Sequence, residues 1–458
     1  MQPVLTPDEM GAVDAAAPEP VEVLIGRAAS AVARQALDLL GGAYGRRVVV
    51  VAGKGNNGND GREAARLLRR RGVRTVVIPV AEAPHTLPPA DLVIDAAFGT
   101  GFHGEYVPPD PAGAPVLAVD IPSGVDGLTG AVPGRAVAAV RTVTFAALKP
   151  GLVFHPGRAL AGDVVLADIG LDVSGALAGV VEPADVAAWV PPRAADAHKW
   201  RAAVVVVAGS RGMTGAAHLA SRAAQRAGAG MVRVATPGLD HDPGLPTEAV
   251  GIAAPAAGWD TVVLEQLDRA GALVVGPGLG RGAPTDVAVL QILASPVPTV
   301  VDGDGLTALG GDPAAALAGR TGPTVLTPHD GEFARLAGGP PGDDRLAAAR
   351  SLAAATGAVV LLKGPSTVVA HPDGRARLVT VGDARLATAG TGDVLSGVIG
   401  ALLAQGVPSF EGAAAGAWLH GRAARYGPDR GLVASDVVDA LPRALAEIDA
   451  LGPSGSHG

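Results

Sequence analysis

Glycines mixed with amide and carboxylate side chains mark the part of this sequence best suited to binding and proton transfer. The stretch Gly53–Gly61 reads Gly-Lys-Gly-Asn-Asn-Gly-Asn-Asp-Gly. Glycines let a backbone approach a ligand closely, and unpaired N–H groups at the start of a following helix can hold an anion. The glycines satisfy a dinucleotide-binding pattern, but that pattern does not account for Asn56, Asn57 and Asp60. We therefore expect an anion-binding turn with additional polar ligands.

Two further polar motifs come from the same half of the chain. Asp95–Gly101 and Asp120–Gly124 each follow a short apolar run, as Gly53–Gly61 does. In an open parallel sheet, ligands bind in the crevice outside the carboxyl ends of the strands. The three motifs are therefore expected to meet at one crevice.

The strongest motif of the second half is Gly390-Thr391-Gly392-Asp393, which runs directly into an apolar stretch at 394–403. Backbone N–H groups of such a turn can hold a phosphoryl oxygen at a helix N-terminus. A carboxylate beside it can accept the proton of a hydroxyl that attacks phosphorus. Asp393 by itself is equally consistent with an N-cap, but the glycines and the apolar helix favour catalysis. Since a free aspartate has a pKa of ~3.9, Asp393 is expected to be ionised at neutral pH and to be a weak base.

Four other turns of the second half also follow apolar runs: Gly276–Gly280, Asp302–Asp304, Thr327–Glu332 and Lys363–Thr367. Taken alone, His329 is better explained as a loop histidine paired with backbone. Lys363 precedes Gly-Pro-Ser-Thr, so a phosphate or nucleotide contact is at least as well supported as a solvated surface cation. A Walker A pattern is absent, which argues against a P-loop.

Lysine is rare in this chain. Only Lys54, Lys149, Lys199 and Lys363 occur among 36 basic residues, so the remaining 32 are arginines. A lysine that persists in an arginine-rich composition is expected where a guanidinium does not fit. Chance survival is the competing explanation for any one of them.

The elements that position these motifs alternate between short β-branched runs and helical patterns. The strands expected in the first half are Arg47–Val51, Thr75–Val80, Asp91–Ala96, Val116–Ile121, Thr142–Ala146 and Asp163–Asp168. Helices are expected over Val23–Leu40 and Asp60–Arg71, which together predict a doubly wound parallel α/β sheet over residues 1–188. A proline-rich linker is expected at 189–200, a second α/β domain at 201–450, and a disordered Gly/Ser-rich tail at 451–458.

Composition bounds the function. The 458 residues are long enough for several domains, and hydrophobic residues make up 48% with only 3% aromatics, so the cores are built from Ala, Val and Leu. A formal charge of −8 argues against a nucleic-acid partner, and the absence of Cys excludes disulfides and thiolate sites. The start of the chain lacks signal-peptide features and no apolar run approaches ~20 residues, so a cytoplasmic protein without a membrane partner is expected.

With these motifs in place, the chain from Thr6 to about Glu447 resembles the bacterial bifunctional NAD(P)H-hydrate repair enzymes. That family fuses an NAD(P)HX epimerase, which is Rossmann-like, to an ADP-dependent NAD(P)HX dehydratase, which is ribokinase-like. Beyond the motifs above, the resemblance includes Lys149–Leu152, Asp196–Lys199, Gly212–Ala217 and His420-Gly421. It implies repair of the small molecules NADHX and NADPHX with consumption of ADP, and a homo-oligomer.

The resemblance also implies site residues in the epimerase half. Asp120 would contact the hydrate and handle the proton during inversion. Asn57, Asp95 and Ser123 would hold K⁺, which suits their oxygen ligands. The residues implied to bind the hydrate, besides Asp120, are Asn56, Asn57, Gly58, Asn59, Asp60, Gly99, Thr100, Gly101, Phe102, His103, Gly104 and Glu105.

In the dehydratase half, the hydrate would be phosphorylated by ADP, with Mg²⁺ expected, and phosphate would then be eliminated. Asp393 would be the catalytic residue, and Ala216, Gly280 and His329 would contact the hydrate with it. The residues implied to bind the nucleotide are Lys363, Gly364, Pro365, Ser366, Thr367 and Gly392.

Three positions depart from the family pattern. Asn59 replaces a usual glycine, so a side chain is expected to enter the phosphate-binding turn. Leu24-Ile25-Gly26-Arg27 replaces a usual Met-Glu pair, and Asp330 replaces a usual proline. The first two concern the epimerase half.

Two alternatives from other classes stay open. One is a ribokinase-like small-molecule kinase fused to a nicotinamide-nucleotide-binding domain without epimerase activity. The other is a binding protein that senses the nucleotide without converting it. Gly209–Ala217 and His329 favour the dehydratase. Retention of four polar residues argues against an inactive first domain: Asn57, Asp95, Asp120 and Ser123.

Overall fold

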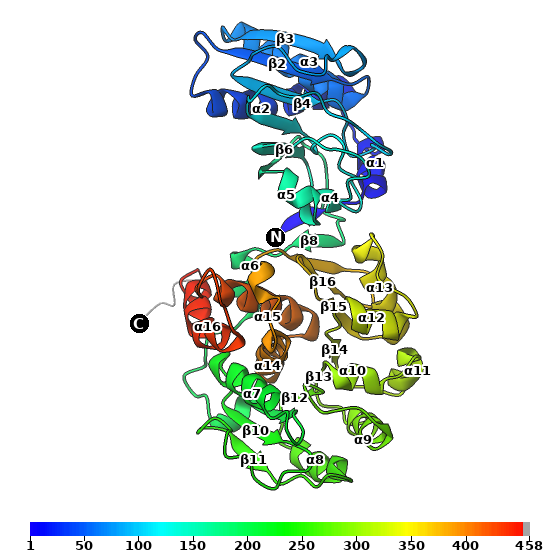
Figure 1. Cartoon of the computed structure of the whole chain (residues 1–458), viewed down its shortest axis with the longest axis vertical. Coiled ribbons are helices and arrows are strands. Elements are labelled where there is room, and N and C mark those ends of the chain that lie inside the picture. The colour runs from blue at the N-terminus through cyan, green and yellow to red at the C-terminus, as the bar shows by residue number, and fades with distance from the viewer. Residues whose placement is uncertain (452–458) are drawn as a thin grey trace. The chain divides into compact units, whose positions relative to one another are not determined.

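The computed structural model describes residues 1–451, which form two compact units. The N-terminal unit spans Gln2–Gly179 and the second unit begins at Val180. The structural division therefore lies before the 189–200 segment that the sequence suggests as a linker. Residues 452–458, nearly all of the expected tail, lie outside the described residues. Figure 1 colours the chain from one end to the other, and each unit is described here by itself.

The N-terminal unit is built on a six-stranded sheet in which all neighbouring strands are parallel. In spatial order the strands are β3 (Arg74–Pro79), β2 (Arg47–Ala52), β4 (Leu92–Ala96), β5 (Val116–Val119), β6 (Arg141–Phe145) and β7 (Asp163–Ala167). The central strands β4 and β5 are buried along their whole length because parallel sheets are covered on both faces. The parallel fold predicted from the sequence is confirmed.

Two long helices, α2 (Val21–Leu40) and α3 (Asn56–Arg70), pack on one face of this sheet. Alanines of both helices fill the space against β2 and β4. At Gly61 a Cβ would lie 2.5 Å from that of Ala96, so only glycine lets α3 approach β4 this closely. The opposite face is covered by Leu87, Val137 and other residues outside helices and strands.

The shorter elements of the N-terminal unit are β1 (Gln2–Val4), α1 (Pro7–Ala15), the 3₁₀ turn η1 (Val80–Glu82), α4 (Pro150–Val153) and α5 (Gly157–Leu160). The strand β8 (Ala178–Val180) lies where the chain passes from one unit to the next.

One helix boundary differs from the prediction in a way that matters for the site. The helix expected from Asp60 begins at Asn56, with Gly55 as its N-cap. Six of the nine residues of the Gly53–Gly61 motif are therefore helix, and only Gly53–Gly55 forms the turn. Asparagine and glycine have low helix propensity, so the sequence pattern understates a helix start that tertiary packing stabilises.

Up to residue 451, the second unit contains nine strands of its own, adjacent in the order β17, β16, β15, β14, β13, β12, β9, β10, β11. Their bounds are β9 (Ala203–Val207), β10 (Met231–Ala235), β11 (Val250–Ile252), β12 (Ala272–Val275), β13 (Thr299–Val301), β14 (Thr324–Leu326), β15 (Val359–Leu362), β16 (Thr367–Ala370) and β17 (Ala376–Val379). The apolar runs before Gly276, Asp302 and Lys363 are the strands β12, β13 and β15. Strand β16 is antiparallel to both β15 and β17, which was not expected.

The helices of the second unit are α6 (Pro183–Trp189), α7 (Gly215–Arg226), α8 (Trp259–Leu267), α9 (Ala283–Leu293), α10 (Asp304–Ala308), α11 (Pro313–Leu317), α12 (Asp330–Ala337), α13 (Arg345–Thr356), α14 (Thr391–Ala404), α15 (Ser409–Ala424) and α16 (Ala434–Asp449). Short 3₁₀ turns are η2 (Lys199–Ala202) and η3 (Ala384–Leu386). No helix within residues 1–451 is both long enough and apolar enough to span a bilayer.

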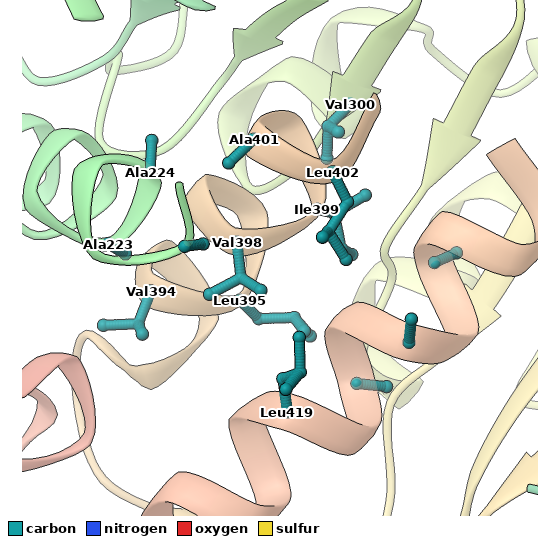
Figure 2. Packing of buried hydrophobic residues seen from close by; sticks show 14 of the residues in the cluster. Ala223, Ala224, Val300, Val394, Leu395, Val398, Ile399, Ala401, Leu402 and Leu419 are labelled. Carbon is teal, nitrogen blue, oxygen red and sulfur yellow. The ribbon is translucent and has the colours of Figure 1, made fainter. Parts of the chain in front are cut away.

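The helix that follows the Gly390–Asp393 turn is the most deeply buried of the unit. Figure 2 shows Val394, Val398 and Leu402 of α14 among side chains from α7, α15 and β13. Glycines allow this packing, because a Cβ on Gly397 would lie 2.1 Å from the carbonyl oxygen of Ala220. Each fully buried Val or Leu contributes ~1.5–3 kcal/mol. The N-terminus of α14, which carries Asp393, is thereby held in place.

Candidate active sites

A cavity of about 990 Å³ opens at the carboxyl edge of the N-terminal sheet. The predicted site residues that line it are Asn56, Asn57, Asp60, Gly99, Thr100, Gly101, Phe102 and Asp120. Three strand-end motifs distant in sequence therefore meet at one cavity, as expected. The cavity is also lined by Asp14 and Lys149, to which no role was assigned from the sequence.

Asp120 lies in a tight, strained turn at the end of β5. Its φ is 68°, and the N–H of Ile121 donates to the carbonyl oxygen of Val119 across it, at 2.9 Å. This is a γ-turn of the uncommon hand, a conformation that costs free energy for any residue with a side chain. The turn directs the carboxylate toward Gly99 and Thr100, and the Thr100 N–H donates to its Oδ2 at 2.9 Å.

Lys149 provides the counter-charge of Asp120. Its Nζ lies 2.7 Å from Oδ1 of Asp120, and its side chain is only 2% exposed. The ammonium also donates to Thr144 Oγ1 at 3.0 Å and to the carbonyl oxygen of Phe145 at 3.1 Å. A buried ammonium with three oxygen partners leaves no space for a planar guanidinium, which agrees with the reasoning from lysine rarity.

Asp60 lies close to this ion pair but has a different protonation state. Its side chain is buried, and burial together with the charges of Asp120 and Asp14 raises its pKa to about 8. The pKa of Asp14 is also raised, by desolvation and by Asp120, although Lys149 opposes the shift. The cavity therefore holds a protonated carboxyl, Asp60, next to the Asp120–Lys149 ion pair at neutral pH.

The raised pKa of Asp60 predicts a stability that depends on pH. Above pH ~3.9 the unfolded chain ionises this group, whereas the folded protein keeps its proton up to about pH 8. Stability is then lost as pH rises across that window. Asp60→Asn is expected to raise the free energy of unfolding at pH 8.5 by on the order of 1–3 kcal/mol and to change it little at pH 4. Calorimetry of the whole chain at both pH values measures this.

The matched control for that experiment is Asp163→Asn, which neutralises an exposed carboxylate at the start of β7. An Asp60→Asn stabilisation of the same size at both pH values would contradict a protonated Asp60.

Asp95 and Ser123 form a buried pair behind the cavity. The Ser123 Oγ donates to Asp95 Oδ1 at 2.7 Å, and its backbone N–H donates to Oδ2 at 2.8 Å. Burial raises the pKa of Asp95 to about 6 in spite of these hydrogen bonds. The amide of Asn57 is buried, and neither its oxygen nor its nitrogen has a hydrogen-bond partner. The structure thus pairs two of the three predicted cation ligands and leaves the third unsatisfied at the cavity wall.

The remaining predicted residues of the first site lie outside the cavity lining. Gly58 packs against Gly53, where a Cβ would lie 2.0 Å from a carbonyl oxygen. Asn59 is exposed and accepts a hydrogen bond from Arg62 at 3.2 Å, so the expectation that its side chain enters the turn is wrong. It points away because the helix already begins at Asn56. His103, Gly104 and Glu105 are exposed in the loop after Phe102.

In the second unit, Asp302 connects two of the predicted motifs. Its Oδ1 lies 2.6 Å from Lys363 Nζ, and its Oδ2 accepts a hydrogen bond from Ser396 Oγ at 2.7 Å. Ser396 also donates to the carbonyl oxygen of Gly392 at 3.0 Å. A Cβ on Gly392 would lie 3.4 Å from Lys363 Nζ. The ammonium of Lys363 is therefore held beside the first turn of α14.

Asp393 is half-buried at the same turn. Burial and the charge of Asp302 raise its pKa to about 7, while Lys363 partly opposes the shift. The expectation of a fully ionised, weak base is wrong, because that argument used the pKa of a solvated aspartate. A pKa near the working pH is the property that a general base requires.

His329 begins α12 as its N-cap. Its Nδ1 accepts hydrogen bonds from the backbone N–H groups of Gly331 and Glu332, at 3.0 and 3.3 Å. The sequence reasoning that favoured backbone pairing for this ring is confirmed. The side chain is 58% exposed, so its Nε2 remains open to solvent apart from Glu332 Oε1 at 3.5 Å.

The other predicted contacts of the second site come from two loops that touch each other. Gly209 donates its N–H to the carbonyl oxygen of Pro277 at 2.7 Å. A Cβ on Gly278 would lie 2.9 Å from that of Ala216. The N–H of Gly280 donates to Asp304 Oδ2 at 2.9 Å. These contacts join Ala216 and Gly280 to the edge where Asp302 and Asp393 lie.

The residues that sequence reasoning missed had weak signals. The signals for Lys149 were the rarity of lysine and its place in a motif. The signal for Asp302 was its position after an apolar run. Asp14 had no signal, since it is an ordinary acidic residue in a short helix.

Comparison with known proteins agrees with this division. A family model described as NAD(P)H-hydrate dehydratase matches residues 204–443, and one described as YjeF-related protein N-terminus matches 21–87 and 78–151. The chain is 42% identical to the bifunctional NAD(P)H-hydrate repair enzyme Nnr of Mycobacterium leprae, covering 94% of this chain and 96% of that protein. It is 34% identical to the Escherichia coli enzyme of the same name, covering 87% and 85%.

Solved structures match the second unit. An ADP/ATP-dependent NAD(P)H-hydrate dehydratase from Bacillus subtilis, co-crystallised with ATP and Mg²⁺, is 31% identical with a TM-score of 0.52 and covers 59% of this chain and 98% of that one. A ribokinase-like protein from Enterococcus faecalis is 26% identical with a TM-score of 0.53 and covers 59% and 96%. The second unit is thus ribokinase-like. The 42% identity to the Mycobacterium leprae enzyme, over nearly the full length of both proteins, shows that this chain belongs to the bifunctional NAD(P)H-hydrate repair enzymes.

Proposed function

We propose that this chain repairs hydrated nicotinamide nucleotides at two separate sites. The N-terminal unit, Gln2–Gly179, epimerises R- and S-NAD(P)HX. The second unit, within 201–450, converts S-NAD(P)HX to NAD(P)H with consumption of ADP. The observation that carries the proposal is the meeting of Lys363, the N-terminus of α14 and a carboxyl with a pKa of about 7 at one sheet edge.

The dehydration is a phosphoryl transfer followed by an elimination. The ring hydroxyl of the hydrate gives its proton to Asp393, and its oxygen forms a bond to the terminal phosphorus of ADP. The bond from that phosphorus to the bridging oxygen breaks and releases AMP. Phosphate then leaves the ring carbon while a neighbouring C–H proton is lost, which restores the double bond. Phosphate is a much better leaving group than hydroxide, and this is the chemical reason for consuming a nucleotide.

The residues around Asp393 suit the charge that develops in this transfer. The backbone N–H groups at the start of α14 can receive phosphoryl oxygens, and the Lys363 ammonium lies beside them. Burial would lower the pKa of Lys363, but Asp302, Glu332 and Asp393 raise it overall. Its positive charge is therefore secure near neutral pH. In this arrangement Lys363, Gly364, Pro365, Ser366, Thr367 and Gly392 bind the nucleotide, and Ala216, Gly280, His329 and Asp393 contact the hydrate.

Mg²⁺ fits this site as an ion carried by the nucleotide. Within residues 1–451, no three His, Asp or Glu side chains cluster to form a metal cage. Mg²⁺ is commonly bound through substrate phosphates with few protein ligands. When bound, it neutralises charge on the transferring phosphoryl group.

Inversion of the hydroxyl-bearing carbon by loss and re-addition of water breaks one C–O bond and forms another on the opposite face. It requires one group that gives a proton to the departing hydroxyl oxygen and one that accepts a proton from the water that adds. Asp60 is protonated at neutral pH and Asp120 is paired with Lys149, and both line the cavity. Environments that push the pKa values of two carboxyls apart divide the acid and base roles between them. Asp60 accordingly donates to the departing hydroxyl oxygen, and Asp120 accepts the proton when the opposite face is hydrated. Asn56, Asn57 and residues 99–102, which also line the cavity, complete the hydrate-binding surface.

K⁺ fits the donor set of Asn57, Asp95 and Ser123. All three offer oxygen ligands, and the buried amide of Asn57 has no partner that a cation would displace. When bound, K⁺ would supply positive charge that favours ionised Asp95. Epimerisation that is equally fast with K⁺ and with tetramethylammonium as the only monovalent cation would exclude this role.

The test of the proposed function uses purified protein, the S-hydrate of NADH, ADP and Mg²⁺. Recovery of the absorbance of the reduced ring, with AMP and phosphate released in equal amounts, is expected. If the absorbance of NADH is not recovered with either ADP or ATP, the dehydratase proposal is wrong. Accumulation of a phosphorylated product without NADH would instead identify a small-molecule kinase.

The dehydratase activity is expected to depend on pH with a midpoint near 7. A base acts in its ionised form, so kcat/KM for the hydrate should fall as pH drops through the pKa of Asp393. Below the midpoint the loss should approach ~10-fold per pH unit. Initial rates between pH 5.5 and 8.5 measure this profile. A rate independent of pH between 6 and 8 would remove Asp393 from the role of base.

A further inference from the structure

A small cavity lies next to the loop that is proposed to hold the nucleotide. Its volume is about 70 Å³, and Gly364, Pro365 and Thr367 form one wall. The opposite wall comes from Gly382, Asp383 and Leu386 and from the last turns of α15, including His420. A single water molecule occupies ~30 Å³ in the liquid, so this cavity has room for only a few atoms. It is large enough for the edge of a heterocycle but too small for a whole nucleotide.

His420 is the polar side chain in this cavity with unused bonding capacity. The residue is only 7% exposed, and its Nε2 is buried without a hydrogen-bond partner. The ring does bond to the backbone of Thr391, and this bond favours its charged form. Since Nε2 has no partner, we assign the proton of the neutral ring to Nδ1, on the side of the Thr391 backbone.

The ring is neutral under working conditions. Burial lowers the pKa of His420 to about 4, and Lys363 lowers it further, while the bond to Thr391 opposes the shift. A neutral imidazole that donates through Nδ1 has an acceptor lone pair at Nε2. A buried acceptor without a partner costs free energy, so a ligand that donates a hydrogen bond there is favoured.

The position of the ring is fixed from both sides. A Cβ on Gly421 would lie 2.8 Å from the backbone nitrogen of Gly382, so α15 lies directly against the 381–383 segment. Thr391, the Nδ1 partner, is buried at the first residue of α14. His420 therefore joins the catalytic turn of α14 to the wall of the nucleotide loop.

We propose that Nε2 of His420 accepts a hydrogen bond from the 6-amino group of the nucleotide base and so selects adenine over 6-oxo purines. This inference rests on the proposed function, in which Lys363–Thr367 binds the adenine nucleotide. The 6-amino group of adenine is a donor, whereas hypoxanthine and guanine carry an acceptor oxygen at that position. With a 6-oxo purine, the acceptor oxygen of the base would face the acceptor Nε2, and neither atom would have a hydrogen-bond donor. Leaving two buried acceptors unpaired costs free energy and weakens the binding of that base.

Direct binding measurements test this without relying on turnover. Titration calorimetry would compare ADP, IDP and N6,N6-dimethyl-ADP, each with Mg²⁺, on the whole chain. ADP is expected to bind at least ~10-fold more tightly than the other two. His420→Asn keeps an amide able to donate to Thr391 but removes the acceptor at Nε2. It should bring the dissociation constants of ADP and IDP within ~2-fold of each other.

The control and the outcomes separate this inference from the proposed function. His371→Asn changes a histidine of the same unit that pairs with Asp373 at the surface, and it should keep the preference for ADP. If ADP and IDP bind the unmodified protein with equal affinity, His420 does not select the base and this inference is wrong. The proposed nucleotide-binding site would not be affected by that result. If a selective protein stays selective after His420→Asn, another group reads the base. Absence of binding by all three nucleotides would overturn the nucleotide site itself and this inference with it.

Discussion

Asp393→Asn is expected to abolish NADH recovery from the S-hydrate while epimer interconversion continues at the rate of the unmodified protein. The substitution keeps the size of the side chain but removes the base that takes the hydroxyl proton. General-base catalysis contributes typically ~10²–10⁴-fold, so a loss in that range is expected in kcat. Two readouts on one sample, absorbance of the reduced ring and chromatography of the two epimers, measure both activities.

The control for this variant must account for the helix. Asp393 lies in the first turn of α14, where a negative charge favours the helix by ~0.3–1 kcal/mol. Asp286→Asn removes an equivalent charge from the first turn of α9, outside the site. It should leave both activities unchanged. If Asp393→Asn stops epimerisation in a folded protein, the two activities share a site and the two-site proposal fails.

Asp120→Asn is expected to stop enzymatic epimerisation, so that R-hydrate is consumed no faster than it inverts spontaneously. Asparagine is a suitable replacement because it tolerates positive φ, whereas alanine would add strain at φ 68°. The variant removes the carboxylate that accepts the proton. It also leaves Lys149 buried without its counter-charge, which is expected to destabilise the unit by ~3–5 kcal/mol.

A double variant separates these two effects. Asp120→Asn combined with Lys149→Met removes both members of the buried ion pair. Replacing a whole buried pair is often neutral or stabilising, so calorimetry should show most of the lost stability restored. Epimerisation should remain absent because the carboxylate is still missing. Recovery of activity together with stability would mean that Asp120 serves only to neutralise Lys149.

Much of the first cavity could be predicted from local patterns. Valine-rich runs followed by Gly53, Asp95 and Asp120 imply parallel strands whose carboxyl ends lie at one edge, and the structure brings these motifs together there. The pattern could not show that the helix begins at Asn56. That boundary depends on packing of α3 against β4 through Gly61, a contact between segments far apart in the chain.

The rarity of lysine was informative for two positions of four. Lys149 lies in a buried ion pair with an aspartate, and Lys363 lies in a part-buried one, which suits the expectation of positions where a guanidinium does not fit. Lys54 is an exposed residue at the cavity rim, and Lys199 lies beside Trp200. Composition thus indicated which residue type to inspect, but the identity of each partner depended on the fold.

The sequence by itself determined the order of the two α/β domains and the strand-end motifs, because these follow from local periodicity and residue type. The resemblance of those motifs to known enzymes indicated the family. Only the tertiary structure decided which groups carry protons. Asp60 and Asp393 are ordinary aspartates in the sequence, yet burial and neighbouring carboxylates raise their pKa values to about 8 and about 7. The free Nε2 of His420 likewise depends on a contact with Thr391 from another helix. Protonation is set by desolvation and by charges brought close in space, and neither is encoded in the spacing of residues along the chain.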